Sequence, residues 1–114
     1  MSEPVILAPV RVHDLRKGDV IYTRKYHDMG GDKGRPAVVL AAYDGSVVVA
    51  YLTAGNPDAS PFHIPTKALP KPSTILLHRS ASISPDRVME RRGSLTPVEM
   101  EQLNNGLSLL YGLA

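Results

Sequence analysis

Two apolar, valine-rich runs joined by Asp44-Gly45 constrain the fold of this chain more than any other feature of its sequence. The runs cover residues 36–43 and 46–53. Asp-Gly between such runs is typical of a β-hairpin with a type I′ turn, in which both central residues take positive φ. Both runs are continuously apolar rather than alternating, which indicates strands buried on both faces. We therefore expect a central hairpin with one face in a barrel core and the other against a helix or a partner subunit.

Further strands are predicted on both sides of this hairpin. Residues 20–23, 62–64 and 74–78 are short runs of β-branched, aromatic and aliphatic side chains, and the second lies between Pro61 and Pro65. Residues 27–34 contain three glycines and no apolar period, which predicts a loop. Ser84-Pro85 favours the start of a short helix, with the serine as N-cap and the proline at the first helical position.

The last element is predicted to be a helix that begins after Thr96. Thr96 as N-cap and Glu99 at the third helical position form a capping box, and Leu95 and Met100 are spaced for a hydrophobic staple. Pro97 suits the first helical position, and Gly112 is placed to end the helix. One apolar stripe, Leu103, Leu107 and Leu110, faces the core. The fold class predicted for residues 1–114 is therefore mainly β with helices (α+β). We expect one domain, a small barrel or curled sheet of five to six short strands with a packed C-terminal helix.

Composition excludes several functional classes. The 114 residues include no cysteine, so thiol nucleophiles, disulfides and Cys-based zinc sites are excluded. The N-terminal stretch has no positively charged start and is interrupted by Pro9, so we expect no signal peptide, no membrane segment and a cytoplasmic location. Residues 1–95 carry 13 basic and 9 acidic side chains, whereas residues 96–114 carry 2 acidic and no basic ones. A mildly basic body is able to attract phosphates.

Four segments form a more specific pattern. They are Gly18-Asp19-Val20-Ile21, then Gly34-Arg35-Pro36-Ala37-Val38-Val39-Leu40, then Tyr51-Leu52-Thr53, and finally residues 73–77 with 82–83 and 91–96. In this order and spacing the chain resembles the MazF/PemK (Kid-type) toxin family of type II toxin–antitoxin systems, over roughly residues 15–112. Residues 34–40 match the most specific signature of that family, (G/H)RPAVVL.

The resemblance implies a fold, an activity and partners. The fold would be an SH3-like barrel that forms a homodimer. The activity would be that of an mRNA interferase, an endoribonuclease that cleaves single-stranded mRNA at a short sequence without a metal or other cofactor. A cognate antitoxin with an acidic C-terminal segment would neutralise it. Carried over to this chain, the active-site arginine and threonine of the family are Arg35 and Thr53.

RNA carries its own nucleophile, the 2′-hydroxyl, and its attack on the adjacent phosphorus leaves a cyclic phosphate. The protein must supply a base, an acid and fixed positive charge beside the phosphorane. A guanidinium matches two phosphate oxygens and stays charged, so Arg35 suits the third role. Its ordinary alternative is an ion pair with a surface carboxylate. Thr53 could donate its hydroxyl to a phosphate oxygen, or serve as a plain β-branched residue at a strand end.

The acid and base cannot be transferred from the family. Many members carry an acidic residue, often in Asp-Gln, where this chain has His78-Arg79, and the Kid-type arginine is replaced by Leu76. His78 is a candidate general base or acid because histidine titrates near neutrality. The alternative is an exposed histidine at a strand end.

Further candidates for RNA contacts are basic side chains in loops and beside the short helix. They are Lys25, His27, Lys33, Arg79 and Arg87. The alternative for each is an ordinary solvated charge. Arg91 and Arg92 could hold RNA or an acidic antitoxin tail. His13 and His63 have no identifiable partner, and four scattered histidines lack metal-ligand spacing, so no metal site is expected.

Two alternatives to the nuclease remain open from the sequence. A catalytically silent member that only binds RNA or a partner is favoured by the loss of the usual acidic residue at position 78. A CcdB-like gyrase poison would keep the fold and change the target. That class relies on a C-terminal Trp-Gly-Ile, whereas this chain has no tryptophan and ends in Tyr111-Gly112-Leu113-Ala114.

Overall fold

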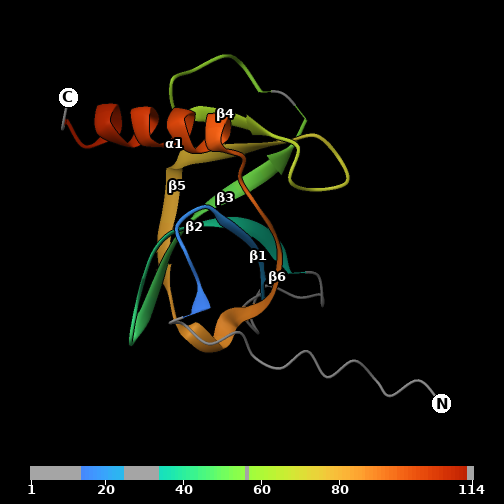
Figure 1. Ribbon diagram of the computed structural model, residues 1–114, viewed down its shortest axis with the longest axis vertical. Helices are drawn as coiled ribbons and strands as arrows, with labels where there is room; N and C mark the ends of the chain where they lie inside the picture. The colour runs from blue at the N-terminus through green and yellow to red at the C-terminus, as the bar shows by residue number, and fades with distance from the viewer. Residues whose placement is uncertain (1–13, 25–33, 56, 113–114) are drawn as a thin grey trace.

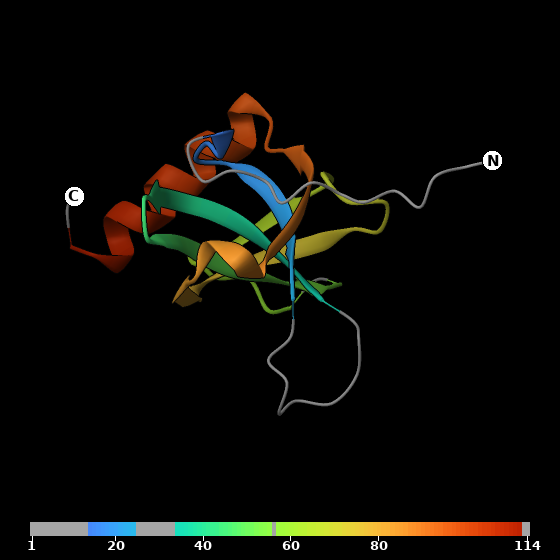
Figure 2. The ribbon, with the colours of Figure 1, turned by 90° about the horizontal axis from the view of Figure 1, so that it is seen from below.

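The computed structural model describes residues 14–24, 34–55 and 57–112, which form one curled antiparallel sheet and a C-terminal helix (Figures 1 and 2). The elements are β1 (Asp19–Thr23), β2 (Arg35–Tyr43), β3 (Ser46–Ala54), β4 (His63–Thr66), β5 (Ser73–Ile83), the 3₁₀ turn η3 (Pro85–Arg87), β6 (Val88–Ser94) and α1 (Pro97–Leu110). The six strands are ordered β4-β5-β3-β2-β1-β6. The expected α+β class is confirmed, and the SH3-like barrel is compatible with this curled sheet.

The predicted central hairpin is confirmed, but the predicted type I′ turn is wrong. Tyr43 pairs with Ser46, so Asp44-Gly45 is a two-residue connection between β2 and β3. The described residues with positive φ are Gly18, Gly55 and Gly112, which excludes a type I′ turn at Asp44-Gly45. A turn with negative φ supplies less of the right-handed twist that strands require. The β-bulge between Val39 and Ala41 adds twist to the same hairpin.

Both faces of the hairpin are buried, as expected, because each contributes to a different hydrophobic cluster. The first cluster lies under the helix and contains Val20, Val38, Ala50, Leu52, Ile64, Ile75, Leu77, Leu95 and Leu103. The second lies on the opposite face and contains Leu15, Ile21, Ala37, Val39, Val47, Val49, Ile83 and Val88. Alternate residues of β2 and β3 thus pack into alternate clusters.

Strand β5 moves from one cluster to the other along its length. Ile75 and Leu77 belong to the first cluster, whereas Ile83 belongs to the second. Between them the pairing with β3 is irregular, because Leu52 pairs with Ile75 while Ala50 pairs with Ser80. Such an irregularity lets a strand bend around a closed or strongly curled sheet. The predicted strand over residues 74–78 is therefore the first half of a longer element.

The edge strands were the elements that the sequence described least well. Pro65 was expected to bound a strand but lies within β4, where an edge position tolerates the missing N–H. Strand β6 has the sequence VMERRGS, whose charges conceal a strand pattern and suit an exposed edge. The predicted short helix is the turn η3, but Ser84 is not its side-chain cap, since its hydroxyl bonds the Asp86 carboxylate.

The C-terminal helix has the predicted capping box. The Thr96 N–H donates to Glu99 at 2.9 Å, and the Glu99 N–H donates to the Thr96 hydroxyl at 3.2 Å. Leu103 is fully buried, and Met100, Leu107 and Leu110 pack partly buried against the first cluster. Gly112 has a φ of +67°, which suits a residue just past a helix end. At 14 residues, α1 is too short to span a bilayer. The described residues form no other helix that is long and apolar enough to do so.

The helix packs tightly against the rest of the fold at Gly106. A Cβ at this buried position would lie 2.5 Å from Leu77 Cδ1 and 2.8 Å from the carbonyl oxygen of Pro61. We expect Gly106→Ala to destabilise the protein despite the better helix propensity of alanine. Overpacking costs about 1–3 kcal/mol, against a gain of about 1 kcal/mol in propensity. Thermal unfolding should show a Tm lowered by about 4–8 °C. The exposed control Asn105→Ala should leave the Tm unchanged or slightly raised, and an unchanged Tm in Gly106→Ala would contradict the close approach.

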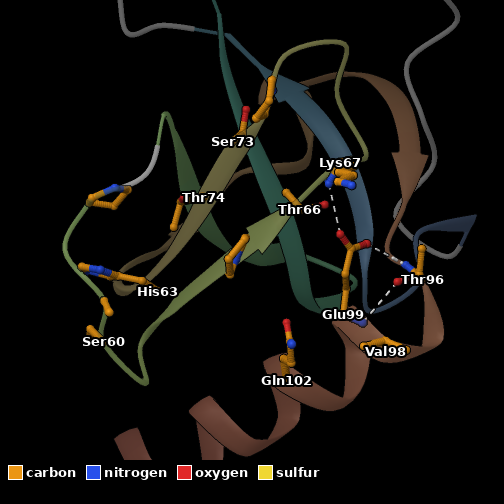
Figure 3. A pocket seen from close by; sticks show the side chains of 14 residues that line it. Ser60, His63, Thr66, Lys67, Ser73, Thr74, Thr96, Val98, Glu99 and Gln102 are labelled. Atoms are coloured by element: carbon orange, nitrogen blue, oxygen red, sulfur yellow. Dashed lines mark hydrogen bonds between the residues drawn. The ribbon is translucent and has the colours of Figure 1, made fainter.

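Glu99 also ties the start of α1 to the end of β4. Its second carboxylate oxygen accepts a hydrogen bond from the Lys67 N–H at 3.1 Å (Figure 3). Burial would raise the pKa of Glu99, but hydrogen bonds from the Thr96 and Lys67 backbones and the Thr66 and Thr96 side chains outweigh it, so the pKa is lowered. The folded state therefore favours the charged carboxylate.

Replacing Glu99 by Gln should reduce stability more at neutral than at acidic pH. A carboxylate with a depressed folded-state pKa contributes stability above its unfolded pKa, and this contribution is lost as the pH falls through the folded value. Urea unfolding should show the largest gap between wild type and Glu99→Gln at about pH 7, closing toward about pH 3. The exposed Glu101→Gln serves as the control. A gap of constant size across this range would show that the Glu99 charge is not involved.

Candidate active site

Strand register aligns four polar residues across one end of the sheet. Thr23 of β1 pairs with Arg35 of β2, and Thr53 of β3 pairs with Thr74 of β5. Ala37 pairs with Tyr51, so Arg35 comes to the level of Thr53 by continuing this register. Residues opposite one another on neighbouring strands share a face. We call Thr23, Arg35, Thr53 and Thr74 the polar row.

The polar row lies where the second cluster ends. Ala37, Val39 and Val49 point to the same face as Arg35 and Thr53, deeper along the strands. Arg35 is exposed and Thr53 is half-buried. This end of the face is therefore open at Arg35 and Thr53, while the rest of the face is filled by apolar side chains.

The two outer threonines of the row are structural. Both are almost fully buried, and each hydroxyl is satisfied by a backbone carbonyl. The Thr23 hydroxyl donates to the Arg35 carbonyl at 3.0 Å, and the Thr74 hydroxyl donates to the Gly55 carbonyl at 2.8 Å. Among the described residues the Thr53 hydroxyl has no hydrogen-bond partner. It thus remains able to donate to a ligand.

Arg35 is positioned by an aromatic ring and by the backbone before it. Its guanidinium carbon lies 5.3 Å from the centre of the Tyr51 ring, within the range of a cation–π contact. A Cβ at Gly34 would collide with the Thr23 carbonyl oxygen, so glycine permits the close approach of β2 to β1 that begins the row. Within the described chain no carboxylate forms an ion pair with Arg35, so its charge is available on the open face.

His78 lies at the start of the irregular stretch of β5, beside His63, for which the sequence indicated no partner. The ring centres of His63 and His78 are 5.5 Å apart, with an interplanar angle of 41°. His63 Nδ1 also lies 2.6 Å from the Asp58 carbonyl oxygen. The expectation that His63 has no partner is therefore wrong. Since His63 pairs with Leu76, His78 is its diagonal neighbour across two strands, a relation visible only once the register is known.

The histidine pair shares a face with the polar row. Thr74, Leu76 and His78 alternate with Ile75 and Leu77, which point into the first cluster under the helix. Thr74 belongs to the row, so Leu76 and His78 extend the same face along β5. The structure therefore brings Arg35, Thr53 and His78 to one face, with His63 added from β4.

The other predicted RNA contacts are placed unevenly. Arg79 is exposed next to His78. Arg87 donates from Nε and Nη2 to the Arg24 carbonyl at 3.2 and 2.7 Å. Thr23 pairs with both Arg35 and Val88, so Arg24 and Arg87 lie at the same end of the sheet as the row. Lys25, His27 and Lys33 lie outside the described residues.

Two further arginines are engaged in contacts on the β6 edge. Arg91 forms an ion pair with Asp19 at 3.3 Å, and Arg92 forms one with Glu90 at 2.5 Å. The Arg92 guanidinium also lies 4.7 Å from the centre of the Tyr22 ring. Over the described ranges, no group of three or more histidine, aspartate or glutamate side chains is arranged to hold a metal ion.

A cavity of about 680 Å³ adjoins His63 (Figure 3). It lies between the loop after β3, strand β4 and the first turn of α1. His63 and Thr74 line it on one side, and Lys67, Glu99 and Gln102 line it on the other. His63 and Thr74 also belong to the open face. The cavity therefore continues the open face toward the helix.

Comparison with known proteins first defines the class of fold. The chain is similar to an endoribonuclease in complex with its cognate antitoxin from Mycobacterial species, with 17% identity, a TM-score of 0.71 and coverage of 86% of this chain and 95% of that one. It is similar to the Mycobacterium tuberculosis toxin MazF-mt6, with 18% identity, a TM-score of 0.69 and coverage of 84% and 98%. It is also similar to the MazE–MazF complex of Deinococcus radiodurans, with 19% identity, a TM-score of 0.68 and coverage of 86% of this chain and 95% of that one.

These similarities show the fold that the chain shares with toxins of this type. The family is shown by a match to a family model. Residues 16–111 match the model of the PemK-like, MazF-like toxin of type II toxin–antitoxin systems. The chain therefore belongs to this toxin family, and the resemblance read from its four segments is confirmed. Comparison with curated proteins finds no match.

Proposed function

We propose that this protein is an endoribonuclease toxin that cleaves single-stranded mRNA at a short sequence without a metal cofactor. The observation that carries the proposal is the open end of the sheet, where Arg35 is held over Tyr51 and aligned with the available hydroxyl of Thr53. Family membership and the similarity to a mycobacterial endoribonuclease support it. We place its action in the cytoplasm, where mRNA is found.

The chemistry that fits this face is cleavage by the RNA itself. The 2′-oxygen attacks the adjacent phosphorus, the P–O5′ bond breaks, and the products are a 2′,3′-cyclic phosphate and a 5′-hydroxyl. Arg35 would neutralise the negative charge that grows on the non-bridging oxygens, because its forked donors match two oxygens at once. Thr53 would donate a further hydrogen bond to the same phosphate. His78 would take part in proton transfer.

Basic side chains would guide the RNA strand. Arg79 is exposed next to His78, where the pairing of β5 is irregular, and Arg87 lies at the end of the sheet that carries Arg35. Lys25, His27 and Lys33 are proposed to contact the RNA from the segment between β1 and β2. A groove with fixed positive charge tracks the phosphates of a single strand, and this attraction weakens with salt.

We further propose a cognate antitoxin and a homodimer. Two of the similar structures are complexes of a toxin-type protein with its antitoxin. An antitoxin segment rich in carboxylates would compete with RNA for Arg35 and Arg79. Dimerisation is supported by an apolar surface where the β2–β3 hairpin meets the end of α1. Tyr43, Leu109 and Tyr111 are 64%, 53% and 58% exposed there, beside a groove of about 550 Å³.

The nuclease proposal predicts cleavage that survives EDTA and depends on Arg35. Removing a charge donor to the transition state typically costs about 10²–10³ in rate, so Arg35→Ala should be slowed by at least about 100-fold. Arg35→Lys should recover only part of the rate, because an ammonium cannot form two parallel bonds. Single-turnover cleavage of a long single-stranded RNA, with mapping of 5′ ends, measures both activity and cut site.

The control is Arg16→Ala, which removes an exposed arginine before β1, at the end of the strand opposite Thr23, and should leave the rate unchanged. Binding of RNA without cleavage would identify a catalytically silent member, an alternative that the replacements at Leu76 and His78 keep open. Gyrase-dependent DNA breaks in intoxicated cells would indicate a gyrase poison instead. Activity that disappears with EDTA and returns with a divalent cation would contradict the metal-independent mechanism.

The dimer proposal predicts that charge on the apolar surface separates the subunits. Tyr43→Lys combined with Tyr111→Lys would replace two exposed aromatic rings by ammonium groups close to Lys17, which typically raises a dimer Kd by about 100-fold or more. Light scattering after size-exclusion chromatography should give half the wild-type mass. Val98→Lys, which is 64% exposed at the other end of α1, is the matched control and should leave the mass unchanged. A monomeric wild type would refute the dimer.

A further inference from the structure

The His63–His78 pair shares the open face with Arg35, with β3 between β2 and β5. The Arg35 guanidinium lies over Tyr51 rather than over its own strand, which brings it one strand nearer to β5. Thr53 pairs with Thr74, and the next residues on the same face are Tyr51 along β3 and Leu76 along β5. Leu76 in turn pairs with His63. The guanidinium and the two imidazoles thus lie on the same face of the sheet.

We infer that His63 is a second catalytic residue and that His63 and His78 act together as general base and general acid. The inference rests on the proposed RNA cleavage. Two titratable groups are needed for this reaction, one for the 2′-hydroxyl and one for the leaving 5′-oxygen. Histidine is the side chain whose charge changes between about pH 5 and 8, so a pair of histidines supplies both roles near neutrality.

The hydrogen bond of His63 assigns the roles. A carbonyl oxygen only accepts, so the contact of 2.6 Å to the Asp58 carbonyl requires a proton on Nδ1 of His63. In the neutral ring this leaves Nε2 with a lone pair, which is the state of a base. The same contact fixes the orientation of the ring, as an orienting group does for a catalytic imidazole. His78 is then the acid, and its exposed ring is open to solvent for reprotonation.

The proton balance closes over one cycle. His63 Nε2 takes the proton of the 2′-hydroxyl while the 2′-oxygen bonds to phosphorus. The P–O5′ bond breaks, and the imidazolium of His78 gives its proton to the departing 5′-oxygen. His63 is left charged and His78 neutral, and exchange of one proton with water restores both. No oxidant, reductant or metal is required.

The surroundings of the pair contain both signs of charge. Asp58 lies in the loop before β4, Arg79 follows His78 on β5, and Arg35 lies over Tyr51 on the same face. Lys67 and Glu99 line the cavity that His63 also lines, and Glu99 is occupied by the backbone of Thr96 and Lys67. The imidazole of His78 is the group whose ring is in contact with that of His63.

The experiment compares His63→Phe and His78→Phe with wild type by single-turnover cleavage. Phenylalanine keeps a flat ring for stacking on a base but transfers no proton. Loss of a general base or acid typically costs about 10²–10⁴ in rate, so each variant should be slowed by at least about 100-fold. Binding of an RNA with a 2′-deoxy residue at the cut site should change by less than about 3-fold. Circular dichroism melting verifies that each variant is folded.

Two further readouts separate the roles. The wild-type rate should be bell-shaped in pH, and His63→Phe should lose the acidic limb because the base is removed. An RNA with a 5′-bridging sulfur has a leaving group that needs no proton. It should restore the rate of His78→Phe but not of His63→Phe. The opposite pattern of rescue would overturn the assignment of roles.

The outcomes distinguish this inference from the function on which it rests. If wild type cleaves RNA and His63→Phe cleaves at the same rate, the second imidazole is refuted and the nuclease stands. If His63→Phe weakens binding but not the rate of bound RNA, His63 only binds RNA through its ring nitrogens and the inference also fails. If wild type cleaves no long single-stranded RNA, both the function and the histidine pair are refuted.

Discussion

The antiparallel pairing of β2 with β3, buried on both faces, is the constraint on which the rest of the molecule depends. Because side chains alternate between the two faces of a strand, apolar residues of this hairpin must be covered by other elements on both faces. The helix α1 covers one face through Leu103, and the residues of β1, β5 and β6 cover the other. The same register that fills the two clusters also sets Arg35 level with Thr53 at the strand ends.

The bend in β5 exposes the polar residues of the candidate site. A strand that contributes Ile75 to one cluster and Ile83 to the other must change face between them. The change occurs in the irregular stretch after Leu77, where His78 and Arg79 are left exposed instead of entering either cluster. Polar side chains are thus left exposed at the bend of β5, on the face that also carries Arg35.

Close backbone packing holds this arrangement. Gly34 allows the start of β2 to approach the Thr23 carbonyl, and Gly106 allows α1 to approach Leu77 and the Pro61 carbonyl. Thr23 and Thr74 use their hydroxyls on backbone carbonyls rather than on ligands. The backbone beneath the open face is therefore fixed by buried contacts. The side chains of Arg35, Thr53 and His78 are not needed for these contacts.

The sequence by itself determined the elements whose signals are local. The hairpin, the capping box of Thr96 and Glu99, and the stripe that includes Leu103 follow from patterns within a few turns or strands. The family followed from residues 34–40 and three further segments, and with it Arg35 and Thr53 as candidates. The turn at Asp44-Gly45 was misjudged because the twist that a type I′ turn provides is supplied in part by a bulge. Only the tertiary structure decided that His63 meets His78, since their contact depends on the pairing of β4 with β5, and no pattern in the sequence encodes the register between two separate strands.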